Sequence, residues 1–321
     1  MSPPSTPRGG VSVGAAADIG SNSLHLLVAV VGSHRLEPLL DESVLLGMGA
    51  AIDSAGFLGS VGRAGLASAV VRYAEAAQRM GAGSLTLIGT EPLRRAFDAP
   101  GILAAVKGAS GLPVFVLAHE EEGELTLLGV TLGRRVTSEL AVVDVGGGST
   151  ELVLVGPDRA PHTTGLAIGS TRLTTRLVAH NPPLASEIAA LRAEARARLA
   201  AAPIGRPRRM IAVGGTASNL LRVLPAAALD RLLTRRRLAE ALDVLASEPF
   251  EEAAARHAVN LTRARTLPAG AAILEAVLER YELDRLHVSE EGIREGTILA
   301  VARGGVAWRD RLPELALGWG R

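Results

Sequence analysis

The chain has 321 residues, 48% of them hydrophobic and 21% charged, which is the composition of a globular protein long enough for two domains. Its net charge is only +1, and it contains no cysteine, which excludes disulfides, thiolate metal sites and a cysteine nucleophile. The longest apolar run near the N-terminus, LHLLVAVV, is too short to span a bilayer, so we expect a cytoplasmic protein.

The first elements that the sequence predicts form a β-hairpin. Apolar and β-branched runs at 13–19 and 24–31 flank the turn residues of the segment AAADIGSNSLHLLVAV, which is the usual pattern of strand, turn and strand. Residues 1–12 are polar and lack the apolar core of a signal peptide, so they are expected to form a disordered lead-in.

The next stretch predicts alternating helices and strands, with helical periodicity at 62–80 and 120–132 and apolar runs at 84–89 and 113–117. The second of these helices opens with a cluster of acids, Glu120, Glu121, Glu122 and Glu124. Acids in a first turn stabilise a helix through its dipole. Four of them exceed that need, and on a helix they cannot all face one way. At least one is therefore free to point into a neighbouring cleft and position a water.

A second hairpin is predicted from VVDVGGGSTELVLV, with strands at 140–145 and 150–155. It repeats the spacing of the first, because both segments spell D-x-G-x-x-S-x-x-L, beginning at Asp18 and at Asp144. Consecutive glycine N–H groups can converge on a phosphate, and the aspartate before them can hold a divalent cation or its waters. Tight hairpins also favour Gly, Asn and Asp without any ligand, but two copies with the same spacing favour a phosphate site.

The remaining sequence continues the α/β pattern. A strand at 209–213 runs into a turn and a helix N-terminus, which is a natural anion site, although many such connections carry two glycines without binding a ligand. Further helices are expected at 184–202, 228–246 and 268–283, and a strand at 285–289.

Two domains are predicted, residues 13–131 and residues 132–304, since the most plausible boundary lies in the segment TLGRRVTSE. A C-terminal tail, 305–321, is expected to pack back on the first domain.

These segments together resemble the exopolyphosphatase/guanosine pentaphosphatase (Ppx/GppA) family, a branch of the actin-like ATPase-fold proteins. The resemblance covers the chain from about residue 14 to 304. It rests on DIGSNSLHLLVA, GTEPLRRA, EEEGELTLLGV, DVGGGSTEL, GLAIGSTRLT, GGTASNL and VSEEGIREG, in that order. It implies an α/β fold of two actin-like, ribonuclease H-like domains with a cleft between them.

The resemblance also implies roles for individual residues. Glu122 matches the family's catalytic glutamate, and its neighbour Glu121 is placed with it in the catalytic group. Asp144 and Glu151 match acids that the family uses around the metal, Mg²⁺ or alternatively Mn²⁺, and the attacking water. The residues that match phosphate-binding positions are Asp18, Gly20, Ser21, Asn22, Ser23, Arg94, Gly146, Gly147, Gly148, Ser149, Arg172, Gly214, Gly215 and Thr216.

The sequence departs from the family pattern in three places. Ala118 and His119 replace a Ser-Gly pair before the acids, so His119 is expected either to contact the substrate or to lie at the rim. Arg265 replaces the aspartate of a common Arg-Ala-Asp segment. Longer relatives append a C-terminal helical domain, and we expect this chain to be a short form without it, which favours short polyphosphates.

The expected function is hydrolysis of the terminal phosphoanhydride of inorganic polyphosphate, an exopolyphosphatase reaction. One alternative is a guanosine pentaphosphate (pppGpp) 5′-phosphohydrolase, and another is a non-catalytic regulator that binds polyphosphate or guanosine penta- or tetraphosphate. A P-loop NTPase is excluded because no G-x-x-x-x-G-K-[ST] occurs. The family suggests a homodimer, and neither a nucleic acid nor a membrane is expected as a partner.

Overall fold

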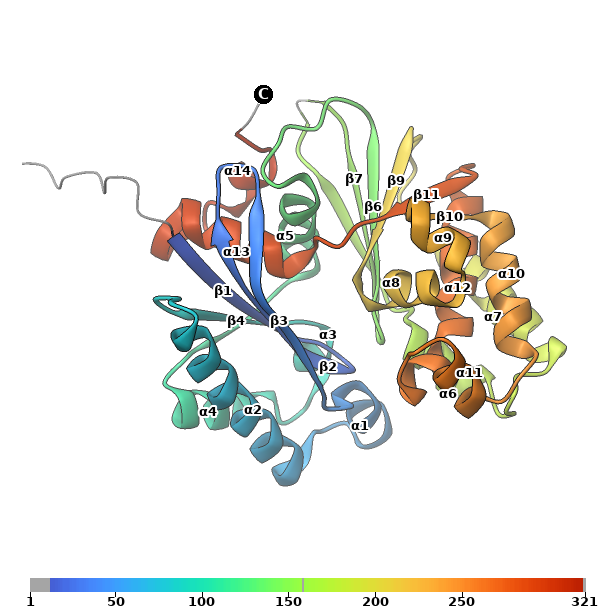
Figure 1. Cartoon of the computed structure of the whole chain (residues 1–321), viewed down its shortest axis with the longest axis horizontal. Helices are drawn as coiled ribbons and strands as arrows, with labels where there is room; N and C mark the ends of the chain where they lie inside the picture. The colour runs from blue at the N-terminus through green and yellow to red at the C-terminus, as the bar shows by residue number, and fades with distance from the viewer. Residues whose placement is uncertain (1–11, 158, 320–321) are drawn as a thin grey trace, which may run out of the picture.

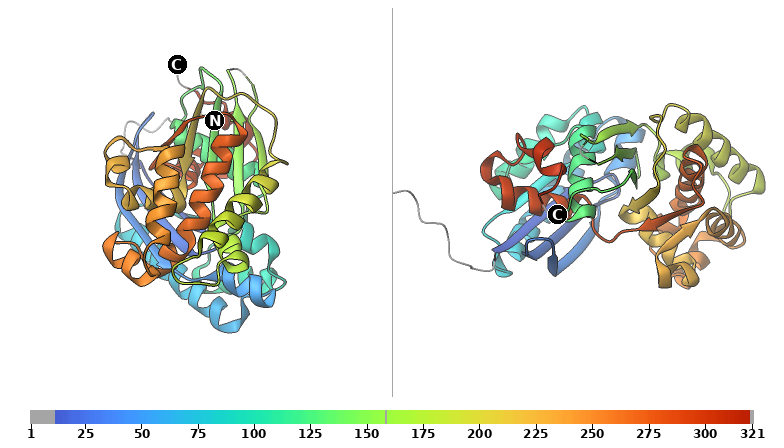
Figure 2. Two further views of the ribbon diagram at one scale, coloured as in Figure 1. Left: turned by 90° about the vertical axis from the view of Figure 1, so that its right-hand side faces the viewer. Right: turned by 90° about the horizontal axis from the view of Figure 1, so that it is seen from above.

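The computed structural model describes residues 12–157 and 159–319, which form two lobes that each contain one β-sheet (Figure 1). The right-hand view of Figure 2 also shows the lobes side by side, joined by segments of the chain that cross between them. The sheet of the first lobe has five strands in the order β3-β2-β1-β4-β5, and that of the second has six in the order β10-β11-β9-β6-β7-β8. The prediction of an α/β protein with two actin-like domains is confirmed.

The first lobe begins with an antiparallel meander and continues with parallel strands. Helices α2 and α4 cover one face of its sheet, where Leu66, Val70, Ile102 and Val106 are buried. The strands are β1 (Ser12–Ile19), β2 (Ser23–Val31), β3 (Leu36–Leu45), β4 (Leu85–Gly89) and β5 (Val114–Val116). The helices are α1 (Met48–Ala55), α2 (Gly59–Arg79), α3 (Glu91–Arg95), α4 (Ala99–Ser110) and α5 (His119–Thr131).

The second lobe repeats this opening hairpin and adds more helices, among which α12 is central because it packs against α6, α7, α8, α10 and α11. Its strands are β6 (Leu140–Val145), β7 (Thr150–Val155), β8 (His162–Leu166), β9 (Arg209–Val213), β10 (Leu232–Thr234) and β11 (Arg285–Val288). Its helices are α6 (Ser170–Leu177), α7 (Ala185–Leu199), α8 (Gly214–Val223), α9 (Pro225–Asp230), α10 (Arg235–Ala246), α11 (Phe250–Arg256) and α12 (Leu261–Arg280).

After β11 the chain crosses back to the first lobe (Figure 1). Helix α13 (Ile293–Gly304) packs on β1, β2 and α5, so it covers the first sheet although it falls within the range predicted for the second domain. The periodicity of a helix shows that one face is apolar but not which sheet that face covers. The tail then forms η1 (Gly305–Ala307) and α14 (Leu312–Ala316) beside α5, with Trp308 and Leu312 buried.

The structure also differs from the predicted elements in detail. Strand β3 was not predicted, because most of its side chains are exposed and polar residues interrupt its apolar pattern. The helix predicted at 228–246 is divided into α9, β10 and α10. The predicted lead-in lies outside the described residues, except for Ser12 at the start of β1. Among the described helices, none is both long and apolar enough to cross a bilayer.

Candidate active site

The two repeated hairpins form turns with the same hydrogen bond. The backbone N–H of Gly20 donates to the carbonyl of Ser23 at 3.0 Å, and the N–H of Gly146 donates to the carbonyl of Ser149, also at 3.0 Å. In the first hairpin Asp18 is the cross-strand partner of His25. At the equivalent place of the second hairpin Asp144 is the partner of Glu151. The sequence repeat is therefore a repeat of backbone geometry.

The turns of the two hairpins meet between the lobes. The Thr171 hydroxyl donates to Oδ1 of Asn22 at 3.1 Å, which connects α6 of the second lobe to the first turn. A Cβ added to Gly147 would lie only 3.0 Å from the Asn22 amide nitrogen and 3.0 Å from Cβ of Ser21. Glycine suits this position, because a side chain here would be tight against the opposing turn and its neighbours would have to give way.

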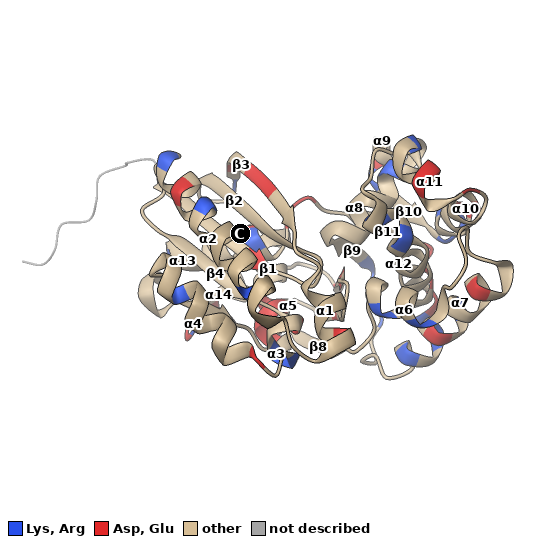
Figure 3. Cartoon of the chain, turned by 90° about the horizontal axis from the view of Figure 1, so that it is seen from below, with Lys and Arg blue, Asp and Glu red and all other residues tan. Residues whose placement is uncertain are grey.

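A cleft of about 810 Å³ runs along these turns and is lined by both lobes. Basic and acidic residues are interspersed on the outside of the lobes (Figure 3). Most of the predicted site residues lie in the cleft wall: Asp18, Gly20, Ser21, Asn22, Ser23, Glu122, Asp144, Gly146, Gly147, Gly148, Ser149, Glu151, Gly214 and Gly215.

The two aspartates of the repeat are buried close to other charges. The pKa of Asp144 is raised to about 7, chiefly by burial and then by the charges of Glu151 and Asp18. Burial likewise raises the pKa of Asp18 to about 7, against the opposing influence of Arg294. Oδ1 of Asp18 has no hydrogen-bond partner among the residues that the structure describes. This part of the cleft therefore concentrates carboxylate oxygens that a cation would stabilise.

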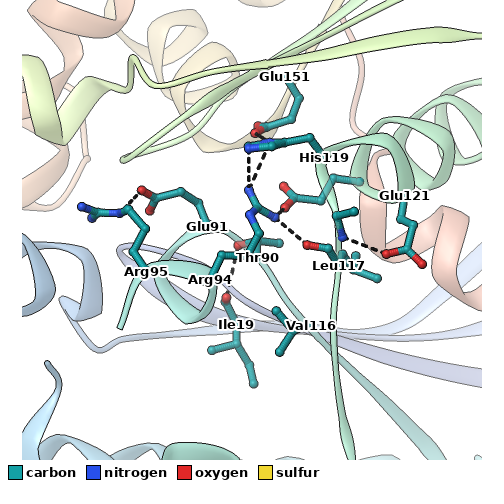
Figure 4. A network of polar contacts seen from close by, with 12 residues as sticks. Ile19, Thr90, Glu91, Arg94, Arg95, Val116, Leu117, His119, Glu121 and Glu151 are labelled. Carbon is teal, nitrogen blue, oxygen red and sulfur yellow. Dashed lines mark hydrogen bonds and ion pairs between the residues drawn. The ribbon is translucent and has the colours of Figure 1, made fainter. Parts of the chain in front are cut away.

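Glu122 lies in the first turn of α5, with its side chain buried at the cleft wall. It forms an ion pair with Arg94 of α3. The Arg94 guanidinium also donates to the carbonyl of Leu117 at 2.7 Å (Figure 4). The Nη2 atom of Arg94 lies 3.1 Å from Nδ1 of His119, and that nitrogen lies 3.1 Å from Oε1 of Glu151. The catalytic candidate is thus held in a network that reaches the second hairpin.

One ligand atom from each of His119, Glu122 and Glu151 lies within 4.8 Å of the other two. Both carboxylates are buried and the imidazole is 36% exposed. This group could hold a metal ion, although the Arg94 guanidinium contacts two of its three members.

The sequence pattern of the Ppx/GppA phosphatase family matches residues 27–303. The chain belongs to this family. Among curated relatives, exopolyphosphatase 1 of Mycobacterium tuberculosis H37Rv is 29% identical over 301 residues, covering 88% of this chain and 86% of the relative. Exopolyphosphatase 2 of the same strain is 30% identical over 316 residues, covering 90% and 98%. A Ppx/GppA phosphatase is a hydrolase, so this chain is one.

Solved structures agree with this family. The Aquifex aeolicus Ppx/GppA family member superposes with a TM-score of 0.77 at 27% identity and covers 91% of this chain and 98% of its own. An exopolyphosphatase from Cytophaga hutchinsonii gives a TM-score of 0.80 at 20% identity, covering 90% and 98%, and shares the fold.

Four residues predicted from the Ppx/GppA pattern are not among the described cleft-lining residues. Arg94 and Arg172 point at carboxylates of their own chain, with Nη2 of Arg172 2.5 Å from Oε1 of Glu91. The Thr216 hydroxyl is buried and donates to the carbonyl of Val145 at 2.7 Å, so it ties the start of α8 to the end of β6. The phosphate-binding role of these three residues stays a prediction.

Glu121 is the fourth, and its position does not support the predicted catalytic role. Its carboxylate accepts a hydrogen bond from the backbone N–H of Ala118 at 2.8 Å and pairs with Arg309 of the tail. These contacts lower the pKa of Glu121 against the effect of burial. The residue after it, Glu122, faces the cleft, because consecutive side chains on a helix point about 100° apart.

The cleft wall also contains residues that the sequence did not single out for the site. Arg263 and Arg294 line it from the second lobe and from the start of α13, and Thr90 and Glu91 line it from the start of α3. In the sequence, Arg263 belongs to the Arg-Ala-Arg segment that departs from the family pattern, and Arg294 belongs to the family motif VSEEGIREG. Neither signal showed that these side chains reach the cleft.

Proposed function

We propose that this phosphatase is an exopolyphosphatase that removes the terminal phosphate of inorganic polyphosphate. The observation that carries the proposal is the pair of opposed hairpin turns, with Gly20 and Gly146 in matching geometry, meeting in one cleft beside Glu122. The turns offer backbone N–H groups to an anionic end group. Two relatives that are called exopolyphosphatases cover most of the chain, which supports this substrate class.

The reaction would follow the general chemistry of phosphoryl transfer. Negative charge spreads over the equatorial oxygens of the transition state, so positioned donors are the main catalytic device. Glu122 orients a water for in-line attack and accepts its proton. The water oxygen bonds to the terminal phosphorus while the bridging P–O bond breaks, and the shortened chain leaves with that bridging oxygen. Orthophosphate is the second product.

The donor set of the cleft fits a divalent cation. Asp144 and Glu151 are cross-strand partners, and Asp18 contributes a buried carboxylate oxygen without a hydrogen-bond partner in the described chain. Oxygen ligands of this kind suit Mg²⁺, and Asp144 and Glu151 would hold it. When bound, the ion would neutralise negative charge on the phosphate oxygens.

A chain-length series tests the proposal. Purified protein with Mg²⁺ is given tripolyphosphate, medium chains and long-chain polyphosphate, and orthophosphate release is measured beside a parallel assay with guanosine pentaphosphate. We expect release from polyphosphate, one phosphate at a time, with short chains preferred. Faster release from guanosine pentaphosphate would favour the nucleotide as substrate, and tight binding of polyphosphate without release would favour a regulator.

A further inference from the structure

We propose that His119, Glu122 and Glu151 form an inhibitory site for Zn²⁺ or a similar transition metal ion. The ion would bind to Glu122, the residue proposed to activate the water. The inference rests on the proposed function for its inhibitory effect, since occupation of Glu122 would withdraw that carboxylate from the water. The proposed zinc site includes the imidazole nitrogen of His119 beside Arg94. It therefore differs from the Asp144–Glu151 carboxylate pair that would hold Mg²⁺.

The geometry of the three side chains carries the proposal. Zinc bonds to nitrogen and carboxylate oxygen at about 2.0–2.2 Å, so tetrahedral ligands lie roughly 3.4 Å apart. Nδ1 of His119 and Oε1 of Glu151 are 3.1 Å apart, close to that spacing. All three ligand atoms lie within 4.8 Å of one another, so a carboxylate oxygen of Glu122 lies near the same position.

The elements that supply these ligands are firmly placed. Glu151 lies within β7 of the second sheet, and His119 and Glu122 lie one helical turn apart at the start of α5, so they face the same side. Both carboxylates are almost fully buried, while the imidazole is one-third exposed and gives an ion a route of entry. Three ligands from two rigid elements leave a fourth position for water or a phosphate oxygen.

A cation already contacts the same atoms. The guanidinium of Arg94 pairs with Glu122 and lies 3.1 Å from the His119 nitrogen that faces Glu151. The group therefore selects positive charge, and a divalent ion must compete with Arg94 for it. Zn²⁺ should bind this group more tightly than Mg²⁺ does, because it forms a strong coordinate bond to imidazole nitrogen and Mg²⁺ prefers oxygen ligands. Arginine can only donate a hydrogen bond to that nitrogen.

Isothermal titration calorimetry with Zn²⁺, in buffer saturated with Mg²⁺, tests the site directly. We expect wild-type protein to bind Zn²⁺, and His119→Ala and His119→Gln to weaken that binding by at least about tenfold. His162→Ala is the matched control, because His162 is exposed on β8 and outside the cluster, and it should bind as wild type does. The proposal would be overturned if both His119 variants bound Zn²⁺ as tightly as wild type, or if wild type did not bind Zn²⁺.

A second measurement separates this inference from the proposed function. Zn²⁺ added to the phosphate-release assay should inhibit the wild type, and His119→Ala should need about tenfold more Zn²⁺ for the same inhibition. Wild type and His119→Ala inhibited at the same Zn²⁺ concentration would contradict an inhibitory role. If the protein released no phosphate from polyphosphate, the proposed function would fail while calorimetry still decided whether the zinc site exists.

Discussion

Arg309 in the C-terminal segment forms a two-pronged ion pair with Glu121 at the start of α5. Its Nη2 atom lies 2.7 Å from Oε2 of Glu121 and donates to the carbonyl of Val116 at 2.8 Å. Arg94 makes the same pattern one residue later, with Glu122 and the carbonyl of Leu117. Two arginines from distant parts of the chain therefore fix the turn from which Glu122 projects into the cleft.

This arrangement predicts that Arg309 positions the catalytic helix without contacting substrate. Arg309→Ala should lower kcat by about tenfold and leave KM for polyphosphate nearly unchanged, because only the transition state depends on the exact place of Glu122. Steady-state phosphate release gives both constants. Arg311→Ala is the control. Arg311 is exposed and contacts Glu314 in the next turn and the carbonyl of Arg303, away from Glu121, so its loss should leave kcat unchanged.

The partner of Arg309 supplies a further check. Glu121→Gln removes the same ion pair, so the double variant with Arg309→Ala should lose little more activity than either single variant. Losses that add in full would mean that the two residues act separately, and a rise in KM would point to a substrate contact instead.

Glu122→Gln addresses the chemistry itself. The amide keeps the size of the side chain but cannot accept the water proton, so kcat should fall on the order of 10²–10⁴-fold while binding of polyphosphate stays mostly intact. Phosphate release and equilibrium binding measure the two effects. The control is Glu120→Gln, because Glu120 is exposed on the same helical turn. Full activity of Glu122→Gln would remove Glu122 from the role of base.

Gly147→Ala tests the contact between the opposed turns. The new methyl would lie 3.0 Å from groups on Ser21 and Asn22, so the turns must separate, with a loss of about 1–3 kcal/mol in the free energy of unfolding and a higher KM. Urea unfolding and kinetics measure both. Gly65 in α2 has open space around it, and Gly65→Ala should instead stabilise the protein by about 0.5–1 kcal/mol. Equal effects of the two substitutions would contradict this account.

The sequence predicted the hairpins of the site because their signals are local. The strand and turn residues around Asp18 and Asp144 repeat one spacing, and the structure repeats one hydrogen bond. The acids at the start of α5 are also a local signal, and the resemblance singles out Glu122 but places Glu121 beside it in the catalytic group. Their roles diverge because Arg309, nearly two hundred residues away, pairs with the first, and no local pattern records such a contact.

The same limit applies to the rest of the site. Arg263 and Arg294 reach the cleft only because α12 and α13 pack where they do, on different lobes. A helix pattern gives the buried face and not its partner, so the sequence alone does not show that α13, within the range predicted for the second domain, packs on the first sheet. The expectation that His119 contacts the substrate or lies at the rim stays a prediction. Its ring lies between Arg94 and Glu151, a relation set by the approach of the two lobes.

Glu124 makes the stability of α5 depend on pH. Its pKa is raised to about 7 by burial first and then by the charges of Glu121 and Glu120. In the unfolded chain the pKa of this group would lie near its ordinary value of 4.5. The folded protein therefore holds the proton more tightly, and the stability due to Glu124 is complete below about pH 4.5 and declines until about pH 7.

Glu124→Gln removes this titration, because the glutamine side chain cannot ionise and so never places a charge in the buried position. The variant should therefore be more stable than wild type at about pH 8, with a smaller difference at about pH 4.5 where the wild-type carboxyl is protonated when folded. Urea unfolding of both proteins at the two pH values measures the difference. A stability gain that is equal at both values would show that the carboxyl is solvated in the folded protein, and that its contacts on α5 do not restrain its ionisation.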